Sequence, residues 1–155
     1  MKKLLIALFL LGLGWQFAIG QEVSPELQKN LQFKGAEATK TEYNAIFQLD
    51  TNNPEIVKKT FRNIRNVLTD KRLIGKLTIE LVTFSGGTDV MLKSSPYIDD
   101  LKDMISKGVQ VAQCENSLRE RNLTKEDILG FIPYVPSGNG ELIIRASQGW
   151  VVIKP

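Results

Sequence analysis

The sequence predicts an α/β fold in which a mainly parallel sheet of about five strands lies between layers of helices. Short runs of apolar and β-branched residues recur along the chain, and segments with helical periodicity separate them. Parallel strands need long crossover connections, and right-handed crossovers place helices on the faces of one sheet. Residues 41–155 are therefore expected to form one α/β domain.

The expected strands are runs rich in strand-forming residues. The run at 76–84 is nearly all apolar or β-branched, which is typical of a strand buried on both faces. The segment at 131–138 is expected to be only briefly extended. The complete set of expected strands is 43–50, 76–84, 109–113, 131–138 and 149–155.

Two main helices are expected, and each begins at residues that favour a helix N-terminus. The first follows Asn53-Pro54-Glu55, and the second follows Ser95-Pro96 and ends at Gly108. Their apolar stripes are Val57, Phe61, Ile64 and Leu68 in the first, and Ile98, Leu101 and Ile105 in the second. Shorter helices are expected after Ser24-Pro25, over 115–120, after a capping box formed by Thr124 and Asp127, and over 141–147.

The N-terminus has the layout of a secretory signal peptide. Two lysines precede an apolar run over 4–13, and small residues at Ala18 and Gly20 suit a cut before Gln21. We therefore expect a signal peptide over 1–20, a polar helix and linker over 21–40, and export to the periplasm or the medium. An uncleaved membrane anchor is the alternative; after cleavage, no membrane association is expected.

The charge and composition of the chain argue against nucleic-acid binding, histidine-dependent catalysis and a zinc or copper site. Residues 1–20 contain two lysines and no acid, so their removal lowers the formal charge from +3 to +1. A nearly neutral chain has no long-range field for nucleic acid. The chain has no histidine, which excludes Cys-His and Ser-His-Asp machinery and leaves few ligands for zinc or copper. No metal or other cofactor is predicted, and the acidic residues Asp99, Asp100 and Asp103 are interpreted as an exposed helix face.

Two segments follow strands at the edge of the sheet where α/β proteins bind ligands. One contains Gly86-Gly87, which allows close approach of a ligand or partner, with a tight turn as the alternative. The other contains Cys114, the only cysteine, at the start of a predicted helix whose unpaired N–H groups favour a thiolate. Cys114 is thus a buried inert thiol, an intermolecular disulfide partner or a reactive free thiol.

Several motifs are similar to those of a known family. They are "FQLD" at 47–50, "VTFSGG" at 82–87, "KGVQVAQCENSL" at 107–118, "VPSG" at 135–138 and "GWVVIKP" at 149–155. Through them, residues 41–155 resemble the DsrE/DsrF-like proteins, and in particular the small stand-alone YchN-like branch.

The resemblance implies a flavodoxin-like three-layer α/β sandwich and assembly into homo-oligomers, often trimers or hexamers. It also implies that Cys114 takes up sulfur as a persulfide and passes it to a thiol or persulfide partner protein. Asn116 and Ser117 match the motif and are expected to position a ligand or cap the helix. Two departures stand out, because the sulfur-relay members are cytoplasmic and Glu115 puts a negative charge beside the thiol.

Three functional hypotheses follow. The first is a sulfur carrier that works through a persulfide on Cys114. The second is a non-enzymatic, homo-oligomeric binding protein of the cell envelope in which Cys114 is structural. The third is a redox sensor that forms an intermolecular disulfide. Solvent exposure of the Cys114 sulfur is expected to separate the first two, because a buried sulfur in aliphatic surroundings argues against a carrier.

Overall fold

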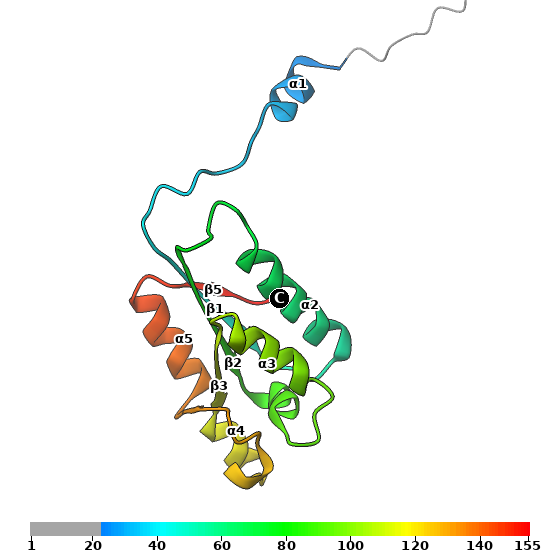
Figure 1. Cartoon of the computed structure of the whole chain (residues 1–155), viewed down its shortest axis with the longest axis vertical. Coiled ribbons are helices and arrows are strands. Elements are labelled where there is room, and N and C mark those ends of the chain that lie inside the picture. The colour runs from blue at the N-terminus through cyan, green and yellow to red at the C-terminus, as the bar shows by residue number, and fades with distance from the viewer. Residues whose placement is uncertain (1–22) are drawn as a thin grey trace, which may run out of the picture. The chain divides into compact units, whose positions relative to one another are not determined.

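The computed structural model describes residues 23–155 (Figure 1). The signal peptide predicted for residues 1–20 lies outside the described residues. The chain divides into two compact units, residues 1–36 and 37–155. The described part of the first unit contains α1 (Pro25–Leu31), where the Ser24 hydroxyl accepts a hydrogen bond from the Leu27 amide at 3.4 Å. No residue of α1 is buried.

The second unit contains a five-stranded, wholly parallel sheet in the order β4-β3-β2-β1-β5, which confirms the predicted fold class. Its strands are β1 (Tyr43–Leu49), β2 (Leu77–Thr83), β3 (Gln110–Cys114), β4 (Tyr134–Val135) and β5 (Val151–Ile153). Strand β4 has only two residues because prolines at 133 and 136 flank it, and proline has no N–H for a ladder. Strand β5 begins only after Gly149, whose φ of +84° turns the chain.

The main helices are α2 (Pro54–Leu68), α3 (Ile98–Ser106), α4 (Glu115–Glu120) and α5 (Gly138–Ser147), and the short 3-10 helices are η1 (Ser85–Met91) and η2 (Lys125–Asp127). The capping box of Thr124 and Asp127 is confirmed. Helix α5 starts earlier than the expected 141 because the Ser137 hydroxyl accepts a hydrogen bond from the Gly140 amide at 3.1 Å.

Helix α3 differs from its prediction at its start and on its buried face. The Ser95 hydroxyl accepts from the Tyr97 amide at 3.2 Å, so Ser95 and Pro96 form a turn before the helix. The buried residues of α3 are Leu101 and Met104, whereas Ile105 is exposed. Met104 lies three residues after Leu101 and therefore shares its face, which the predicted stripe had assigned to Ile105.

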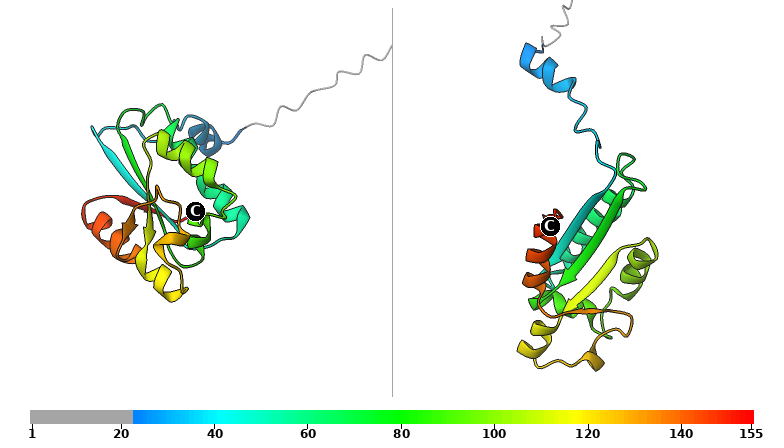
Figure 2. Two further views of the ribbon diagram at one scale, coloured as in Figure 1. Left: turned by 60° about the horizontal axis from the view of Figure 1, so that its bottom comes forward. Right: turned by 90° about the vertical axis from the view of Figure 1, so that its left-hand side faces the viewer.

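The helices cover opposite faces of the sheet because the crossovers step in opposite directions. The chain moves one way from β1 to β4, and then steps back past β1 to reach β5. A right-handed crossover that runs in the reverse direction places its helix on the other face. Figure 2 shows α5 on one face and α2 and α3 on the other.

The two faces of the sheet carry unequal hydrophobic clusters. The larger cluster packs under α2 and α3 and includes Phe47, Phe61 and Leu101. The smaller one consists of the buried residues Ile46, Val82, Phe84 and Cys114, with Val135, Leu142 and Trp150 partly buried against them. Cys114 therefore belongs to the thinner of the two layers, beneath α5.

Candidate functional site

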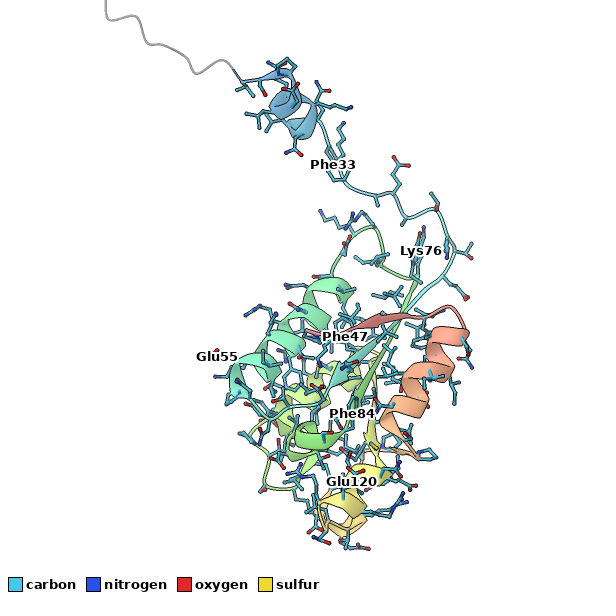
Figure 3. All side chains as sticks on the ribbon, turned by 180° about the vertical axis from the view of Figure 1, so that it is seen from behind. Phe33, Phe47, Glu55, Lys76, Phe84 and Glu120 are labelled. Atoms are coloured by element: carbon cyan, nitrogen blue, oxygen red, sulfur yellow. The ribbon has the colours of Figure 1, made fainter. Side chains whose placement is uncertain are left out.

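A small cavity lies at the carboxyl ends of β2, β3 and β4, where ligands bind in open α/β sheets. Its volume is about 90 Å³. Figure 3 shows Phe84 and Glu120 toward this end of the sheet and Lys76 at the opposite end. The cavity is lined by Phe84, Ser85, Cys114, Asn116, Ser117, Glu120, Ser137, Gly138 and Asn139.

Cys114 is the last residue of β3 and stands between two environments. Its side chain packs in the cluster of Ile46, Val82 and Phe84, and the residue is only 3% exposed. It also lines the cavity, whose other walls are mostly polar. A water molecule occupies roughly 30 Å³ of liquid, so the cavity can hold a few atoms of that size. It can therefore admit an added sulfur atom or a small anion, and not a large substrate.

The structure brings Asn116 and Ser117 to this cavity together with Cys114. The Ser117 hydroxyl accepts a hydrogen bond from the Ser85 amide at 2.8 Å, and the Asn116 carbonyl oxygen accepts one from the Arg119 guanidinium. Ser117 thus joins α4 to the segment after β2. Both side chains shape the cavity wall.

Ser85 has a left-handed backbone conformation, with a φ of 48°, at the point where β2 ends. Arg121 donates to the Ser85 carbonyl at 2.9 Å and pairs with Asp89, while Asn52 donates to the same carboxylate at 2.7 Å. A non-glycine residue with positive φ persists only where its surroundings hold it. These contacts therefore fix the β2 side of the cavity.

Gly86 and Gly87 approach strand β1 and do not line the cavity. The Gly86 amide donates to the Asp50 carbonyl at 3.1 Å. A Cβ atom on Gly87 would lie 2.0 Å from the Leu49 carbonyl oxygen. These glycines allow close approach of the backbone of the neighbouring strand, and their predicted role in binding a ligand stays a prediction.

A buried polar network that the sequence did not reveal holds the end of β3. The Gln113 side chain, which is fully buried, accepts from the Thr83 hydroxyl at 2.7 Å and donates to Thr88 and to the Cys114 carbonyl at 3.0 and 2.9 Å. Buried amides need such partners, so this network favours one backbone position. It fixes the Cys114 backbone from the face opposite its sulfur.

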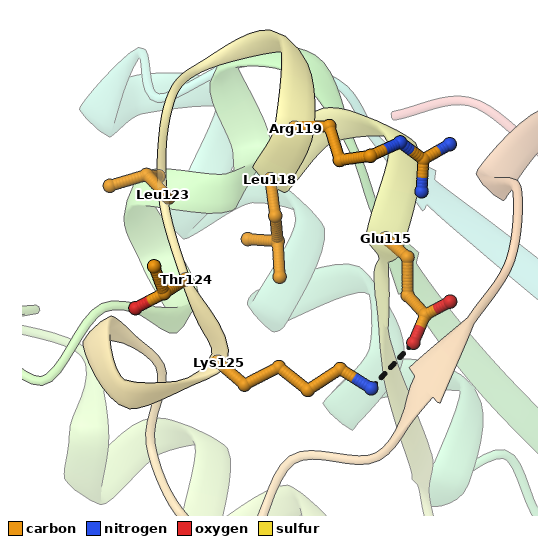
Figure 4. A pocket seen from close by; sticks show the side chains of 6 residues that line it. All are labelled: Glu115, Leu118, Arg119, Leu123, Thr124 and Lys125. Atoms are coloured by element: carbon orange, nitrogen blue, oxygen red, sulfur yellow. Dashed lines mark ion pairs between the residues drawn. The ribbon is translucent and has the colours of Figure 1, made fainter.

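The negative charge of Glu115 is neutralised by Lys125. Their charged groups are 2.6 Å apart beside a second pocket of about 250 Å³, shown in Figure 4. The hydrogen bond that Lys125 donates to Glu115 raises the pKa of Lys125. The Glu115 carboxylate is thus paired beside this second pocket, and Glu115 does not line the cavity that holds Cys114.

Two of the three acidic residues of α3, Asp100 and Asp103, form ion pairs on its surface. Arg65 of α2 lies 2.5 Å from Asp100 and 3.3 Å from Asp103, and Lys107 also pairs with Asp103. Within residues 23–155, no group of three potential metal-binding side chains gathers.

No helix among residues 23–155 has both the length and the apolar character needed to cross a membrane.

Fold and site together define a parallel α/β sandwich protein with one thiol at the carboxyl end of an inner strand. The chain belongs to the DsrE/DsrF-like family, whose model matches residues 45–155. The solved structure of MTH1491 from Methanobacterium thermoautotrophicum, described as a protein of unknown function, is 30% identical with a TM-score of 0.69. The similarity covers 74% of this chain and 100% of that one.

A second solved structure shares the fold alone. It is BT1422 from Bacteroides thetaiotaomicron, also described as a conserved protein of unknown function, at 11% identity and a TM-score of 0.59. The similarity covers 78% of this chain and 100% of that one. No curated protein sequence matches this chain. The comparisons therefore give the family and the fold.

Proposed function

We propose that the protein is an exported sulfane-sulfur carrier in which Cys114 holds the sulfur as a persulfide. The observation that carries the proposal is the small cavity beside the single thiol of the chain, which has space for an added sulfur atom. Membership of the DsrE/DsrF-like family, which is linked to sulfur relay, supports the same chemistry. The absence of histidine from the chain suits exchange between sulfurs, which needs a thiolate and no separate base.

The transfer step conserves atoms and electrons without an oxidant. The Cys114 thiolate attacks the outer sulfur of a donor persulfide, RS–SH, and a new S–S bond forms. The donor S–S bond breaks, RS⁻ leaves with the electron pair, and Cys114 carries –S–SH. An acceptor thiolate then attacks the outer sulfur and releases the Cys114 thiolate.

The cavity walls would stabilise the bound sulfur. Gly138 and Asn139 line the cavity at the start of α5, where the first N–H groups have no acceptor within the helix. Such groups and the helix dipole favour a negative charge, which a persulfide carries once deprotonated. Phe84 adds an apolar side chain to the same cavity.

The burial of Cys114 favours the second candidate, a non-enzymatic binding protein of the cell envelope. The residue is 3% exposed and packs among apolar side chains, as structural cysteines do. In that case the sulfur fills space beneath α5 and exchanges with no partner. Reactivity of the folded protein separates the two functions.

The deciding experiment uses the mature chain, residues 21–155, and its Cys114→Ser and Cys114→Ala variants. Each is incubated with polysulfide under native conditions, weighed by intact mass spectrometry, and then offered a thiol acceptor. A carrier gains one sulfur per chain at Cys114 and loses it to the acceptor, whereas the variants gain none. A thiol that reacts only after unfolding would establish Cys114 as core packing.

Export is proposed from the N-terminal sequence. Expression of the full-length chain in a bacterium is expected to yield a protein that begins at Gln21 and is found in the periplasmic fraction or the medium. A chain of full mass in the membrane fraction would instead identify residues 1–20 as a retained anchor.

Assembly with copies of the same chain is proposed from the α5–β5 side, defined here as α5 and β5 with their exposed residues Ile143, Ile144, Val151 and Val152. Strand β5 pairs with β1 along one edge, and its second edge pairs with no other described strand. An apolar edge of this kind offers backbone and side-chain contacts to another copy. In a carrier, such assembly would bring several Cys114 sites into one particle.

A further inference from the structure

Helix α5 covers Cys114 but buries little apolar surface of its own. Gly138 is its only buried residue, Leu142 is half-buried, and Ile143 and Ile144 are 70% and 52% exposed. By contrast, α2 on the other face buries four residues, Val57, Thr60, Phe61 and Ile64. Because attachment by the hydrophobic effect follows buried apolar area, α5 is the more weakly attached of the two helices to the sheet of its own chain.

One charged contact joins α5 to the centre of the sheet. Arg145 Nε donates to Glu80 of β2 at 2.7 Å and to Glu141 at 2.9 Å, and the guanidinium lies 4.2 Å from the centre of the Trp150 ring. Glu80 is 2% exposed, although every other residue of its strand is apolar or β-branched. Gly138, Glu141, Leu142 and Arg145 share one face of α5 at helical spacing.

The ionised form of the buried Glu80 carboxylate is stabilised by the positive charge of Arg145. Burial raises the pKa of the Glu80 carboxyl, and the positive charge of Arg145 opposes that rise. A buried carboxylate without a partner is strongly unfavourable. Loss of the Arg145 contact would therefore draw water to Glu80, under α5.

The same helix forms part of the wall of the thiol cavity. Its first residues, Gly138 and Asn139, line the cavity, and a Cβ atom on Gly138 would lie 2.6 Å from the Phe84 ring. Leu142, one turn further along, packs on the cluster that contains Cys114. Movement of α5 away from the sheet would therefore expose the Cys114 sulfur without unfolding α2, α3 or the strands.

We propose that Arg145 is a positioning residue that clamps α5 over β2, and that release of this clamp gives a sulfur donor or acceptor access to Cys114. The inference rests on the proposed function only where it identifies the molecule that reaches Cys114 as a sulfur donor or acceptor. That Arg145 controls access to the thiol does not depend on that function. It resolves the conflict between a buried sulfur and a carrier role, because the partner protein would react with an opened form. Burial then protects the cargo between transfers.

The test measures two quantities on the mature chain: the rate of Cys114 alkylation by iodoacetamide at several low urea concentrations, and the global free energy of unfolding. Arg145→Met keeps most of the aliphatic contact and removes the charge. It is expected to raise the alkylation rate about ten-fold or more, since a buried hydrogen bond between charged groups is lost and the closed position of α5 is less favoured. Adding Glu80→Gln to this variant removes the unpaired carboxylate and is expected to reverse much of the increase.

Urea dependence distinguishes opening of α5 from global unfolding. Opening one helix exposes little surface, so the alkylation rate should rise only weakly with urea, whereas a reaction through global unfolding would follow the full unfolding slope. Arg145→Lys, which keeps the charge and weakens the stacking and the fork geometry, is expected to give a smaller increase and serves if Arg145→Met does not fold.

The matched control is Arg65→Met, which removes an arginine that also joins two carboxylates across elements, on the opposite face of the sheet. It is expected to leave the alkylation rate of Cys114 at the wild-type value. If Cys114 of an Arg145 variant is alkylated at the wild-type rate, or with the urea dependence of global unfolding, the proposed role of Arg145 is wrong.

Sulfur uptake from polysulfide, measured on the same proteins, separates the clamp from the proposed function. Rapid alkylation of Arg145→Met without any persulfide would retain the clamp and refute the carrier. Sulfur uptake at the same rate in wild type and Arg145→Met, together with equal alkylation rates, would retain the carrier and refute the clamp.

Discussion

At the scale of single residues, Cys114 shows how a sulfur can be both buried and placed for chemistry. One side of its side chain packs in an apolar cluster, and the other meets a cavity with mostly polar walls. The neighbouring charge of Glu115 is paired with Lys125. A sulfur held there would be shielded from thiols in solution and released only when the site opens.

Gly87 gives the sharpest prediction at this scale. A Cβ atom would lie 2.0 Å from the Leu49 oxygen, so Gly87→Ala must displace η1 or the end of β1. We expect a loss of about 1–3 kcal/mol in unfolding free energy, the typical range for overpacked sites, measured by urea denaturation.

The control is Gly130→Ala, because no atom lies within 4 Å of a Cβ built on Gly130. Its unfolding free energy should stay within about 0.5 kcal/mol of wild type. Equal stability of the two variants would show that the glycine packing against β1 is not required.

At the scale of elements, the turn that joins α2 to β2 depends on one carboxylate. Asp70 accepts from the Arg72 amide at 3.0 Å and forms two bonds with its guanidinium, at 3.0 and 2.6 Å. These bonds, the guanidinium bonds first, lower the pKa of Asp70 from 3.8 to about 2. Its ionised form is therefore favoured by the folded turn.

This shift predicts a pH dependence with a defined sign. Because the folded pKa lies below the unfolded one, Asp70 stabilises the protein above about pH 4, and this contribution is lost as the pH falls toward 2. Asp70→Asn should therefore be less stable than wild type at pH 6, and the difference should vanish near pH 2. Urea denaturation at both pH values measures it; a difference that persists or grows at low pH would contradict the assignment.

At the scale of the whole molecule, the two layers of helices differ in how they are held. The layer of α2 and α3 covers the larger hydrophobic cluster, whereas α5 relies on Arg145 and leaves isoleucines in solvent. Exposed apolar groups on a thin layer are typical of an interface. The α5–β5 side is therefore where we expect copies of the chain to meet.

The proposed assembly is tested by sedimentation of the mature chain. The wild type should sediment as a trimer or hexamer, and Ile143→Lys and Val151→Lys should shift it toward monomer, because a charge would be buried in the interface. Phe131→Lys, which changes an exposed apolar residue in the segment before β4, is the control and should leave the assembly intact. A monomeric wild type would refute the proposal.

Local sequence signals determined most of the fold. Capping residues and apolar periodicity predicted α2 and the capping box of η2, because these signals act over a short stretch of chain. The brief extended segment within 131–138 is observed as the two-residue strand β4. Two details were wrong: Ser137 caps α5 earlier than expected, and packing on the sheet buries Met104 of α3 in place of Ile105.

The sequence by itself determined the class of fold, the family and which residue carries the only thiol. It also indicated Asn116 and Ser117 as neighbours of that thiol, because they follow it within one helical turn. Only the tertiary structure decided that Gly87 contacts β1, that Glu115 turns to Lys125, and that Glu80 and Arg145 meet across 65 residues of chain. Such contacts form between segments that are distant in sequence. The burial of Glu80 is explained only by its ion pair with Arg145 of α5.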